Sequence, residues 1–430
     1  MLARIIALNC MALLAACRAN LAQEPTEAFR ERIEAAASIG DTAALATLVE
    51  QRCNALDGEA LSTCREDTFL LIASKRRVSL ALGALATLGQ RDRGVAASGH
   101  ALTHVIGITA WQPGDDVATV FRSCNGLFQS GCYHGVIQAY LTAEGEVDSI
   151  RTTALCDEID PTGVDRWLRF QCVHGLGHGL EMAWNWDLPR ALGGCDWLAT
   201  DWDRQACYGG AFMENSVAST PGAHHTATRA LDAGVAPPDD GHAAHQHGPP
   251  SAPPFKMRDS ADALYPCSVV GDRYLAACYI SHGAILLAAS GNDFGRAAAA
   301  CADAPEQFRW ACHLSLGTNA SGWTLQDTPQ VISHCNQGDP AYRPWCFVGA
   351  VKNYIDVTAD PADGIAFCTA VPSGASRQAC WRAVGEQLVA LYSGDGARRA
   401  AECDKIESAE GRGICRGAAR ISRESGVVSR

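Results

Sequence analysis

The cysteine residues of this chain recur at a nearly fixed spacing, which restricts the possible folds more than any other feature. Setting aside Cys10 and Cys17 near the amino terminus, eighteen of the twenty cysteines fall into close pairs. The pairs are Cys53 with Cys64, Cys124 with Cys132, Cys156 with Cys172, Cys195 with Cys207, Cys267 with Cys278, Cys301 with Cys312, Cys335 with Cys346, Cys368 with Cys380 and Cys403 with Cys415. From Cys278 to Cys415 the second cysteines follow at steps of 34, 34, 34 and 35 residues. A fixed period near 34 is typical of stacked helical hairpins.

An aspartate stands eight residues before the first cysteine in each of the last eight pairs. These residues are Asp116, Asp148, Asp187, Asp259, Asp293, Asp327, Asp360 and Asp395. Aspartate accepts hydrogen bonds from the free amides of a first helical turn and suits its dipole, so each should begin the first helix of a hairpin. The sequence therefore predicts an all-α, right-handed α/α solenoid of about ten hairpins, most of them stapled by a local disulfide.

One unit, CADAPEQFRWACHLSLG from Cys301 onward, shows the repeat clearly, with two cysteines about ten residues apart and a small residue after the second. This pattern resembles the cysteine-rich repeat proteins of the Helicobacter type, which are disulfide-stapled relatives of tetratricopeptide and Sel-type repeats. The resemblance covers the chain from about residue 40 to 425. It implies an α/α repeat fold and no particular activity.

The amino-terminal apolar stretch is too short to cross a bilayer and indicates a secretory signal. Its end, Leu-Ala-Ala followed by Cys17, resembles the bacterial lipobox. We therefore expect residues 1–16 to be a signal peptide, Cys17 to carry lipid, and residues 17–40 to hold the anchor region and an entry helix. Cleavage after Ala22 is the alternative. Export to the periplasmic side of a bacterial envelope membrane, with membrane contact through the lipid alone, suits paired cysteines because disulfides persist there.

Histidines recur in register over three adjacent units. Counted from the second cysteine, or from Ser98 where a cysteine is missing, the second residue on is His100, His134 and His174, and the sixth is His104, Gln138 and His178. In the next unit, Glu214 is the seventh residue after Cys207. Residues four apart share one helix face, so two of these units can each chelate an ion with a histidine pair. The single histidine of the middle unit, His134, can complete such a site.

The first and third of these units would lie roughly 16–20 Å apart in a straight stack. Either the concave side narrows, or two metal centres form with His134 near both. One histidine on an apolar face is more often a hydrogen-bonded core residue, but five in one register favour a functional site. The glycines of HGLGHG, residues 174–179, cost helix stability, which suggests that something large approaches the backbone there.

From this register we predict a transition-metal site in the concave groove, formed by His100, His104, His134, His174, His178 and Glu214. Imidazole suits copper, iron and zinc alike, and several histidines with a carboxylate fit a centre that activates oxygen or water. Whether the chain is an enzyme stays open. A periplasmic copper- or zinc-binding protein and a bis-histidine haem b protein are alternatives, whereas haem c is disfavoured because Cys-x-x-Cys-His is absent.

A different class of function is a cell-envelope scaffold that binds a peptide or protein in its groove without catalysis. A net charge of −12 argues against nucleic acid as a partner. Zinc ribbons are disfavoured because their short Cys-x-x-Cys pairs are missing.

The register divides the chain into two repeat regions, residues 41–215 with the histidine face and residues 259–430 as plain scaffold. Residues 216–258 between them are rich in Pro, Gly, Ala and His and poor in large apolar residues. Such a composition cannot form a core, so it predicts a disordered surface insertion. The histidines within it are either an accident of composition or a mobile metal-capturing tract.

Overall fold

The computed structural model describes residues 26–143, 147–161, 163, 165–219 and 255–420. These residues form 21 α-helices with four short 3-10 turns and no β-strand. The predicted signal peptide, Cys17 and the histidines of the insertion lie outside the described residues. No helix in the described ranges is both long and apolar enough to cross a bilayer.

After an entry helix, α2 (Thr26–Ser38), the chain forms successive helical hairpins. Their first helices are α3 (Thr42–Cys53), α5 (Val78–Arg91), α7 (Val117–Phe121), α9 (Ser149–Ile159), α11 (Leu188–Cys195), α16 (Phe294–Ala300), α18 (Thr328–Asn336), α20 (Pro361–Ala370) and α22 (Gly396–Asp404). Their second helices are α4 (Gly58–Ala73), α6 (Arg93–Ala110), α8 (Gly131–Ala143), α10 (Arg166–Ala183), α12 (Asp201–Ala218), α17 (Arg309–Trp323), α19 (Arg343–Thr358), α21 (Ala375–Leu391) and α23 (Ala409–Ala419). The prediction of an all-α chain of helical repeats is confirmed.

One unit departs from this pattern. It has two short helices, α14 (Leu275–Ser281) and α15 (Gly283–Ala289), and no first helix. The prediction that Asp259 begins a helix is wrong, because Asp259 lies in a turn where its side chain accepts from the amide of Ala261. The other seven predicted aspartates each cap a first helix through the side chain.

Nine disulfides join the same cysteine pairs that the sequence predicts. The bonds link Cys53 with Cys64, Cys124 with Cys132, Cys156 with Cys172, Cys195 with Cys207, Cys267 with Cys278, Cys301 with Cys312, Cys335 with Cys346, Cys368 with Cys380 and Cys403 with Cys415. Each closes a separation of 8 to 16 residues within one unit. The hairpin of α5 and α6, which carries His100 and His104, has no disulfide among the described residues.

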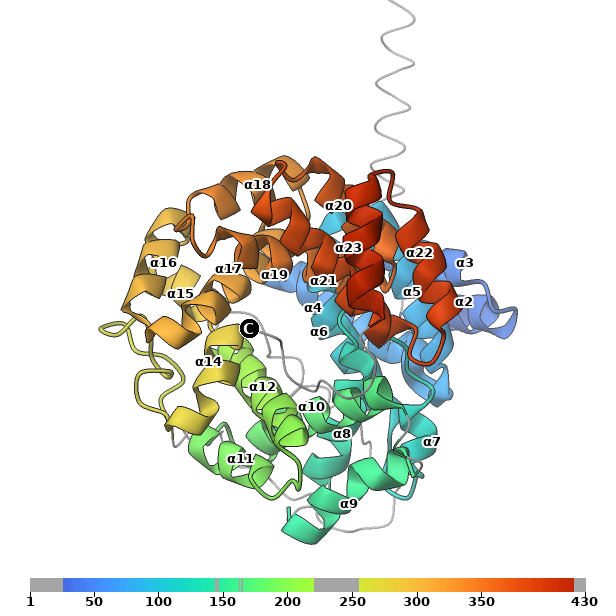
Figure 1. Ribbon diagram of the computed structural model, residues 1–430. Helices are drawn as coiled ribbons and strands as arrows, with labels where there is room; N and C mark the ends of the chain where they lie inside the picture. The colour runs from blue at the N-terminus through green and yellow to red at the C-terminus, as the bar shows by residue number, and fades with distance from the viewer. Residues whose placement is uncertain (1–25, 144–146, 162, 164, 220–254, 421–430) are drawn as a thin grey trace, which may run out of the picture.

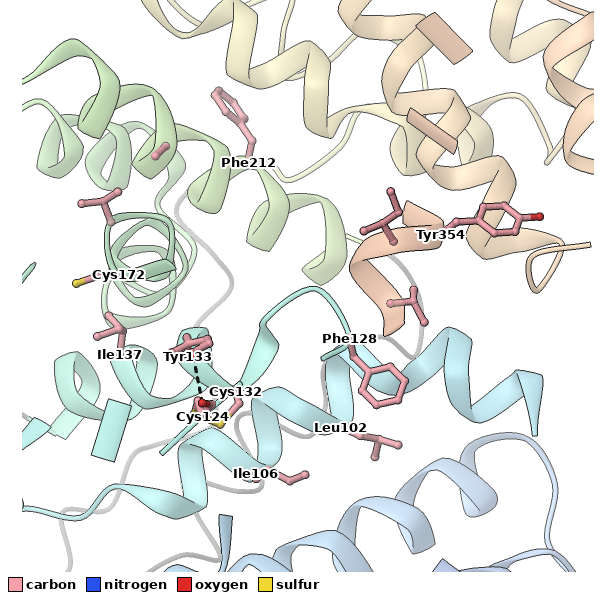
Figure 2. Packing of buried hydrophobic residues seen from close by; sticks show 14 of the residues in the cluster. Leu102, Ile106, Cys124, Phe128, Cys132, Tyr133, Ile137, Cys172, Phe212 and Tyr354 are labelled. Carbon is pink, nitrogen blue, oxygen red and sulfur yellow. Dashed lines mark hydrogen bonds between the residues drawn. A yellow bond between two sulfur atoms is a disulfide. The ribbon is translucent and has the colours of Figure 1, made fainter. Parts of the chain in front are cut away.

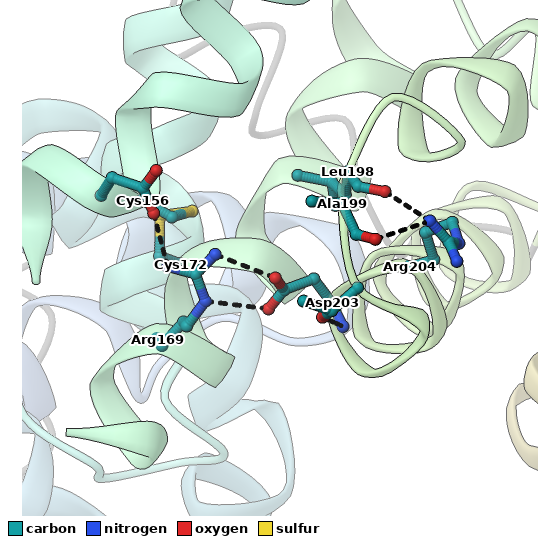
Figure 3. Close-up of polar contacts among 9 residues, drawn as sticks. Cys156, Arg169, Cys172, Leu198, Ala199, Asp203 and Arg204 are labelled. Atoms are coloured by element: carbon teal, nitrogen blue, oxygen red, sulfur yellow. Dashed lines mark hydrogen bonds and ion pairs between the residues drawn. A yellow bond between two sulfur atoms is a disulfide. The ribbon is translucent and has the colours of Figure 1, made fainter. Parts of the chain in front are cut away.

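Arginine forms a second recurring link inside the hairpins. In five units the arginine three residues before the second cysteine donates to a backbone carbonyl at the end of the first helix or just after it. The pairs are Arg204 to Leu198, Arg309 to Ala304, Arg343 to Asn336, Arg377 to Val371 and Arg412 to Ile406. Figure 3 shows the first of them. The guanidinium satisfies carbonyls that the helix end leaves without intrahelical partners.

The second helices contact one another in order around the molecule. In Figure 1, α8, α10, α12, α17 and α19 lie on the inner side of a ring of helices, and α9, α11, α16 and α18 lie at its rim. The ring is joined where α6 contacts α19. There the amides of Phe128 and Gln129 donate to the carbonyls of Val357 and Asp356, at 2.9 and 2.7 Å. Figure 2 shows Phe128 beside Leu102 of α6, with Tyr354 of α19 on its other side.

Glycine pairs set the close packing of the inner helices. A Cβ on Gly177 of α10 would overlap the carbonyl oxygen of Cys207, and one on Gly210 of α12 would overlap that of His174. Gly107 and Gly135 play the same part between α6 and α8. The backbone of the neighbouring helix is therefore what approaches the glycine-rich HGLGHG segment.

We expect Gly177→Ala to lower the free energy of unfolding by about 2 kcal/mol or more, because α10 and α12 must separate to admit the methyl group. The matched control is Gly193→Ala in α11, where an added Cβ meets nothing within 4 Å. That change should raise the free energy of unfolding by up to about 1 kcal/mol, the helix-propensity gain. Denaturant unfolding measures both. Equal effects of the two substitutions would contradict the packing argument.

Candidate metal centre

The five predicted histidines come together between three consecutive inner helices. His100 and His104 lie on α6, His134 on α8, and His174 and His178 on α10. Four of the side chains are buried, with exposed fractions of 1 to 7%, and His100 is partly buried. The cluster thus lies within the helix packing, whereas the sequence suggested an open groove.

The imidazole rings are in mutual contact. The ring centroid of His134 lies 4.8 Å from that of His178 and 4.9 Å from that of His174. Its distances to the ring centroids of His104 and His100 are 5.3 and 5.6 Å. The first and third units approach closely as well, with His104 and His178 at 5.2 Å. The close packing therefore removes the separation expected for a straight stack.

The cluster contains two overlapping sets of three. In His100, His104 and His134, one ring nitrogen of each lies within 4.8 Å of the others, and the same holds for His134, His174 and His178. His134 belongs to both sets. The sequence left two arrangements open: a narrowed concave side, or two metal centres with His134 near both. The structure has the close approach of the first and the central His134 of the second.

Four of the rings are oriented by an acceptor on Nδ1. Nδ1 of His100 lies 2.9 Å from the carbonyl oxygen of Phe128, and Nδ1 of His174 lies 3.1 Å from that of Ala206. Nδ1 of His104 meets Gln138 Oε1 at 2.9 Å, and Nδ1 of His178 meets Glu214 Oε2 at 2.9 Å. A carbonyl or carboxylate oxygen can only accept, so each Nδ1 carries a proton, and in the neutral form of each ring the lone pair is on Nε2.

The Nε2 atoms so defined face one another. They are 3.1 Å apart in the pair of His100 and His104 and 3.3 Å apart in the pair of His174 and His178. Two nitrogens at about 2.05 Å from one tetrahedral ion are roughly 3.3 Å apart. Lone pairs this close repel unless a cation or a proton lies between them. Burial opposes the proton, since it lowers the pKa of His174 to about 4.

His134 differs from the other four histidines. Its Nε2 lies 3.3 Å from Gln171 Oε1, and its Nδ1 is buried without a hydrogen-bond partner among the described residues. Burial, together with the surrounding histidines, holds its pKa well below the ordinary value. The ring is therefore neutral at physiological pH. With Nε2–H donating to Gln171, its lone pair is on Nδ1.

Glu214 lies behind the histidines and belongs to neither set of three. Its Oε2 accepts from His178 Nδ1 and, at 3.2 Å, from Gln138 Nε2, which links the carboxylate to His104 through the same glutamine. The structure thus places Glu214 Oε2 where it orients two rings, and the other oxygen, Oε1, is buried without a hydrogen-bond partner among the described residues. Such outer partners raise ligand basicity and fix ring orientation. The direct metal ligation predicted from the sequence stays a prediction.

Gln138 occupies the register position of His104 and His178, and no role for it was predicted from the sequence. A second buried carboxyl, Glu181, has neither oxygen hydrogen-bonded among the described residues. Burial and then the charge of Glu214 raise its pKa well above the ordinary value.

Two further features hold the helices that carry the site. Arg169, one turn before Cys172 on α10, forms two 2.9 Å contacts with the buried carboxylate of Asp203 on α12 (Figure 3). The acceptor for His100 lies in a left-handed run, with φ of 49°, 57° and 63° at Phe128, Gln129 and Ser130. Such a run costs roughly 1–2 kcal/mol per residue and persists only where the surroundings enforce it.

No protein-family model, curated protein or solved structure matches this chain. The resemblance to cysteine-rich repeat proteins consequently stays a prediction. Any functional conclusion has to come from the geometry of the histidine cluster itself.

Proposed function

We propose that the five clustered histidines bind one or two transition-metal ions and that the chain is a metalloprotein. The observation that carries this proposal is the orientation of the rings. Four Nδ1–H groups are engaged by outer acceptors, which turns four Nε2 lone pairs toward the interior of the cluster. This is the arrangement usual for metal-ligating histidines.

The donor set narrows the choice of ion. Neutral imidazole nitrogens suit copper, iron and zinc, whereas the oxygen ligands favoured by magnesium and calcium are absent from both sets of three. A haem b is disfavoured, because the centroid of the central ring, His134, lies within 5.6 Å of the centroids of the other four rings, which leaves no room for a macrocycle among them. His134 would be shared by the two sets, Gln138 and Glu214 would orient their partners, and the ion would supply Lewis acidity or redox chemistry.

The wider setting is part of the same proposal. The repeats form a right-handed α/α solenoid that curves onto itself, and the protein is exported and held at a bacterial envelope membrane by lipid on Cys17. An oxidising compartment supports the nine disulfides and supplies the oxygen or water that such a centre would activate. A peptide-binding scaffold of the envelope is the second candidate, but it gives no reason for bringing five histidines into contact.

Elemental analysis with an optical spectrum tests the proposal, on protein exported to an oxidising compartment and purified without a histidine tag. We expect one or two equivalents of copper, iron or zinc. A variant lacking residues 221–254 should retain the metal, which separates the buried cluster from the histidines of the insertion. A metal-free protein that cannot be reconstituted with any of these ions would overturn the proposal and favour the scaffold.

A further inference from the structure

A cavity lies where the ring of helices is joined, beside the histidine cluster. It is bounded by α6 and the turn before α8 on one side and by α17, α19 and the turn between α17 and α18 on the other. Its lining includes Arg93, His100, Phe128, Ser321, Gln326 and Asn353. His100 is thus a wall of this cavity and a member of the cluster at once. We call this space the junction cavity.

Three of the residues that line the junction cavity each carry a buried polar atom without a hydrogen-bond partner among the described residues. These atoms are Ser321 Oγ, Gln326 Nε2 and Asn353 Oδ1. The Ser321 side chain is fully buried, and that of Asn353 is 5% exposed. Buried polar groups are almost always paired, so three in one small cavity indicate an occupant that pairs them.

The chemistry of these atoms describes the occupant. Gln326 Nε2 offers an N–H and needs an acceptor, Asn353 Oδ1 needs a donor, and the Ser321 hydroxyl can serve either. A cavity volume of about 50 Å³ compares with roughly 10–15 Å³ for one water, so a molecule of about four non-hydrogen atoms fits. A carbonyl oxygen joined to an N–H group, as in a simple amide, satisfies both side-chain amides at once.

We propose that the junction cavity binds a small amide-type molecule through Ser321, Gln326 and Asn353 and presents it to the metal centre beside His100. The second half of this proposal rests on the proposed metal function, whereas the first half does not. It also gives the carboxy-terminal repeats a part in the site, since α17, the turn after it and α19 supply the polar groups.

The test uses acetamide as the probe, followed by ligand-observed NMR on the full-length protein without metal. We expect saturable binding with a millimolar dissociation constant, as suits so few atoms. Asn353→Leu and Ser321→Ala should each weaken it at least about tenfold. Gln330→Ala is the control, because Gln330 is exposed on α18 and does not line the cavity. Absence of saturable binding, or equal binding by wild type and the Asn353→Leu variant, would overturn the proposal.

Thermal unfolding separates a binding role from a structural one. Because Ser321 Oγ and Asn353 Oδ1 have no partners within the described residues, apolar replacements remove an unmet hydrogen-bonding group, and the melting temperature should stay constant or rise. A marked fall in the melting temperature of both variants would show that these groups stabilise the fold and would overturn the assignment.

Cobalt(II) loading tests the link to the metal centre. Acetamide should shift the visible bands of the cobalt protein in wild type and not in Asn353→Leu. Saturable acetamide binding that leaves the cobalt bands unchanged would overturn the link to the metal centre and leave amide binding by the cavity standing. Failure to take up cobalt would count against the metal function, while the titration without metal would still decide whether the cavity binds amides.

Discussion

His134→Ala should reduce metal binding more than the loss of any other single histidine, because His134 is the residue shared by both sets of three. Replacing only the outer partners of metal ligands costs about 10–100-fold in affinity, so we expect removal of this ligand to cost more than 100-fold. Metal should also stabilise the variant much less. At a concentration a thousand times the wild-type dissociation constant, the stabilisation is about 4 kcal/mol for the wild type and should fall below about 1.4 kcal/mol for the variant.

The matched control for this experiment is His313→Ala. His313 is also buried, with 3% of its surface exposed, and its ring stacks on Tyr342 at 5.4 Å in the carboxy-terminal half. Both substitutions leave a cavity of similar size, but the control should retain full metal content. Competition titration and elemental analysis read out the two variants. Unchanged affinity in His134→Ala would show that the cluster is not the metal site.

Replacing Cys156 and Cys172 together by alanine should lower both stability and metal affinity. Opening a 16-residue loop costs about 3 kcal/mol in the chain-entropy account. Cys172 lies two residues before His174, so loss of the disulfide also frees the first turns of α10, which hold the ligands against α8 and α12. We expect metal affinity to fall by about tenfold or more.

The disulfide between Cys403 and Cys415 provides the comparison, because it closes a similar 12-residue loop far along the chain from the histidines. Its removal should also cost about 3 kcal/mol and leave metal affinity unchanged. Denaturant unfolding gives the stability of each variant, and a competition titration gives the affinity. If both double substitutions change metal affinity equally, the loss of affinity does not come from local positioning of α10 by the Cys156–Cys172 disulfide.

The sequence predicted the parts of the fold that depend on neighbours along the chain. A disulfide across 8 to 16 residues or an aspartate capping the next helix leaves a pattern repeated from unit to unit. Asp259 shows the limit of that reasoning. It keeps the spacing of the pattern, but the residues after it form turns and no helix.

Part of the candidate site could also be predicted, because it depends on the same repeat along the chain. The histidine register follows from the repeat, so the three carrier helices and the central place of His134 could be read from it. The depth of burial could not, because it depends on glycine pairs that bring neighbouring helices close. The orientation of the Glu214 side chain could not be predicted either. The register placed Glu214 on the histidine face, but the packing of α12 turns its carboxylate toward Nδ1 of His178.

The contact between the 128–129 segment and the end of α19 joins regions far apart in the sequence, and no local sequence pattern predicts it. It has a consequence for how such a protein can change over evolutionary time. An open array of repeats tolerates the gain or loss of a unit, since each repeat meets only its neighbours. Here the units between α6 and α19 must span a fixed circuit, so a duplication or deletion among them would pull the two ends out of register. We therefore expect the number of repeats between α6 and α19 to be fixed by geometry, and variation in length to occur at the outer ends and as insertions between helices.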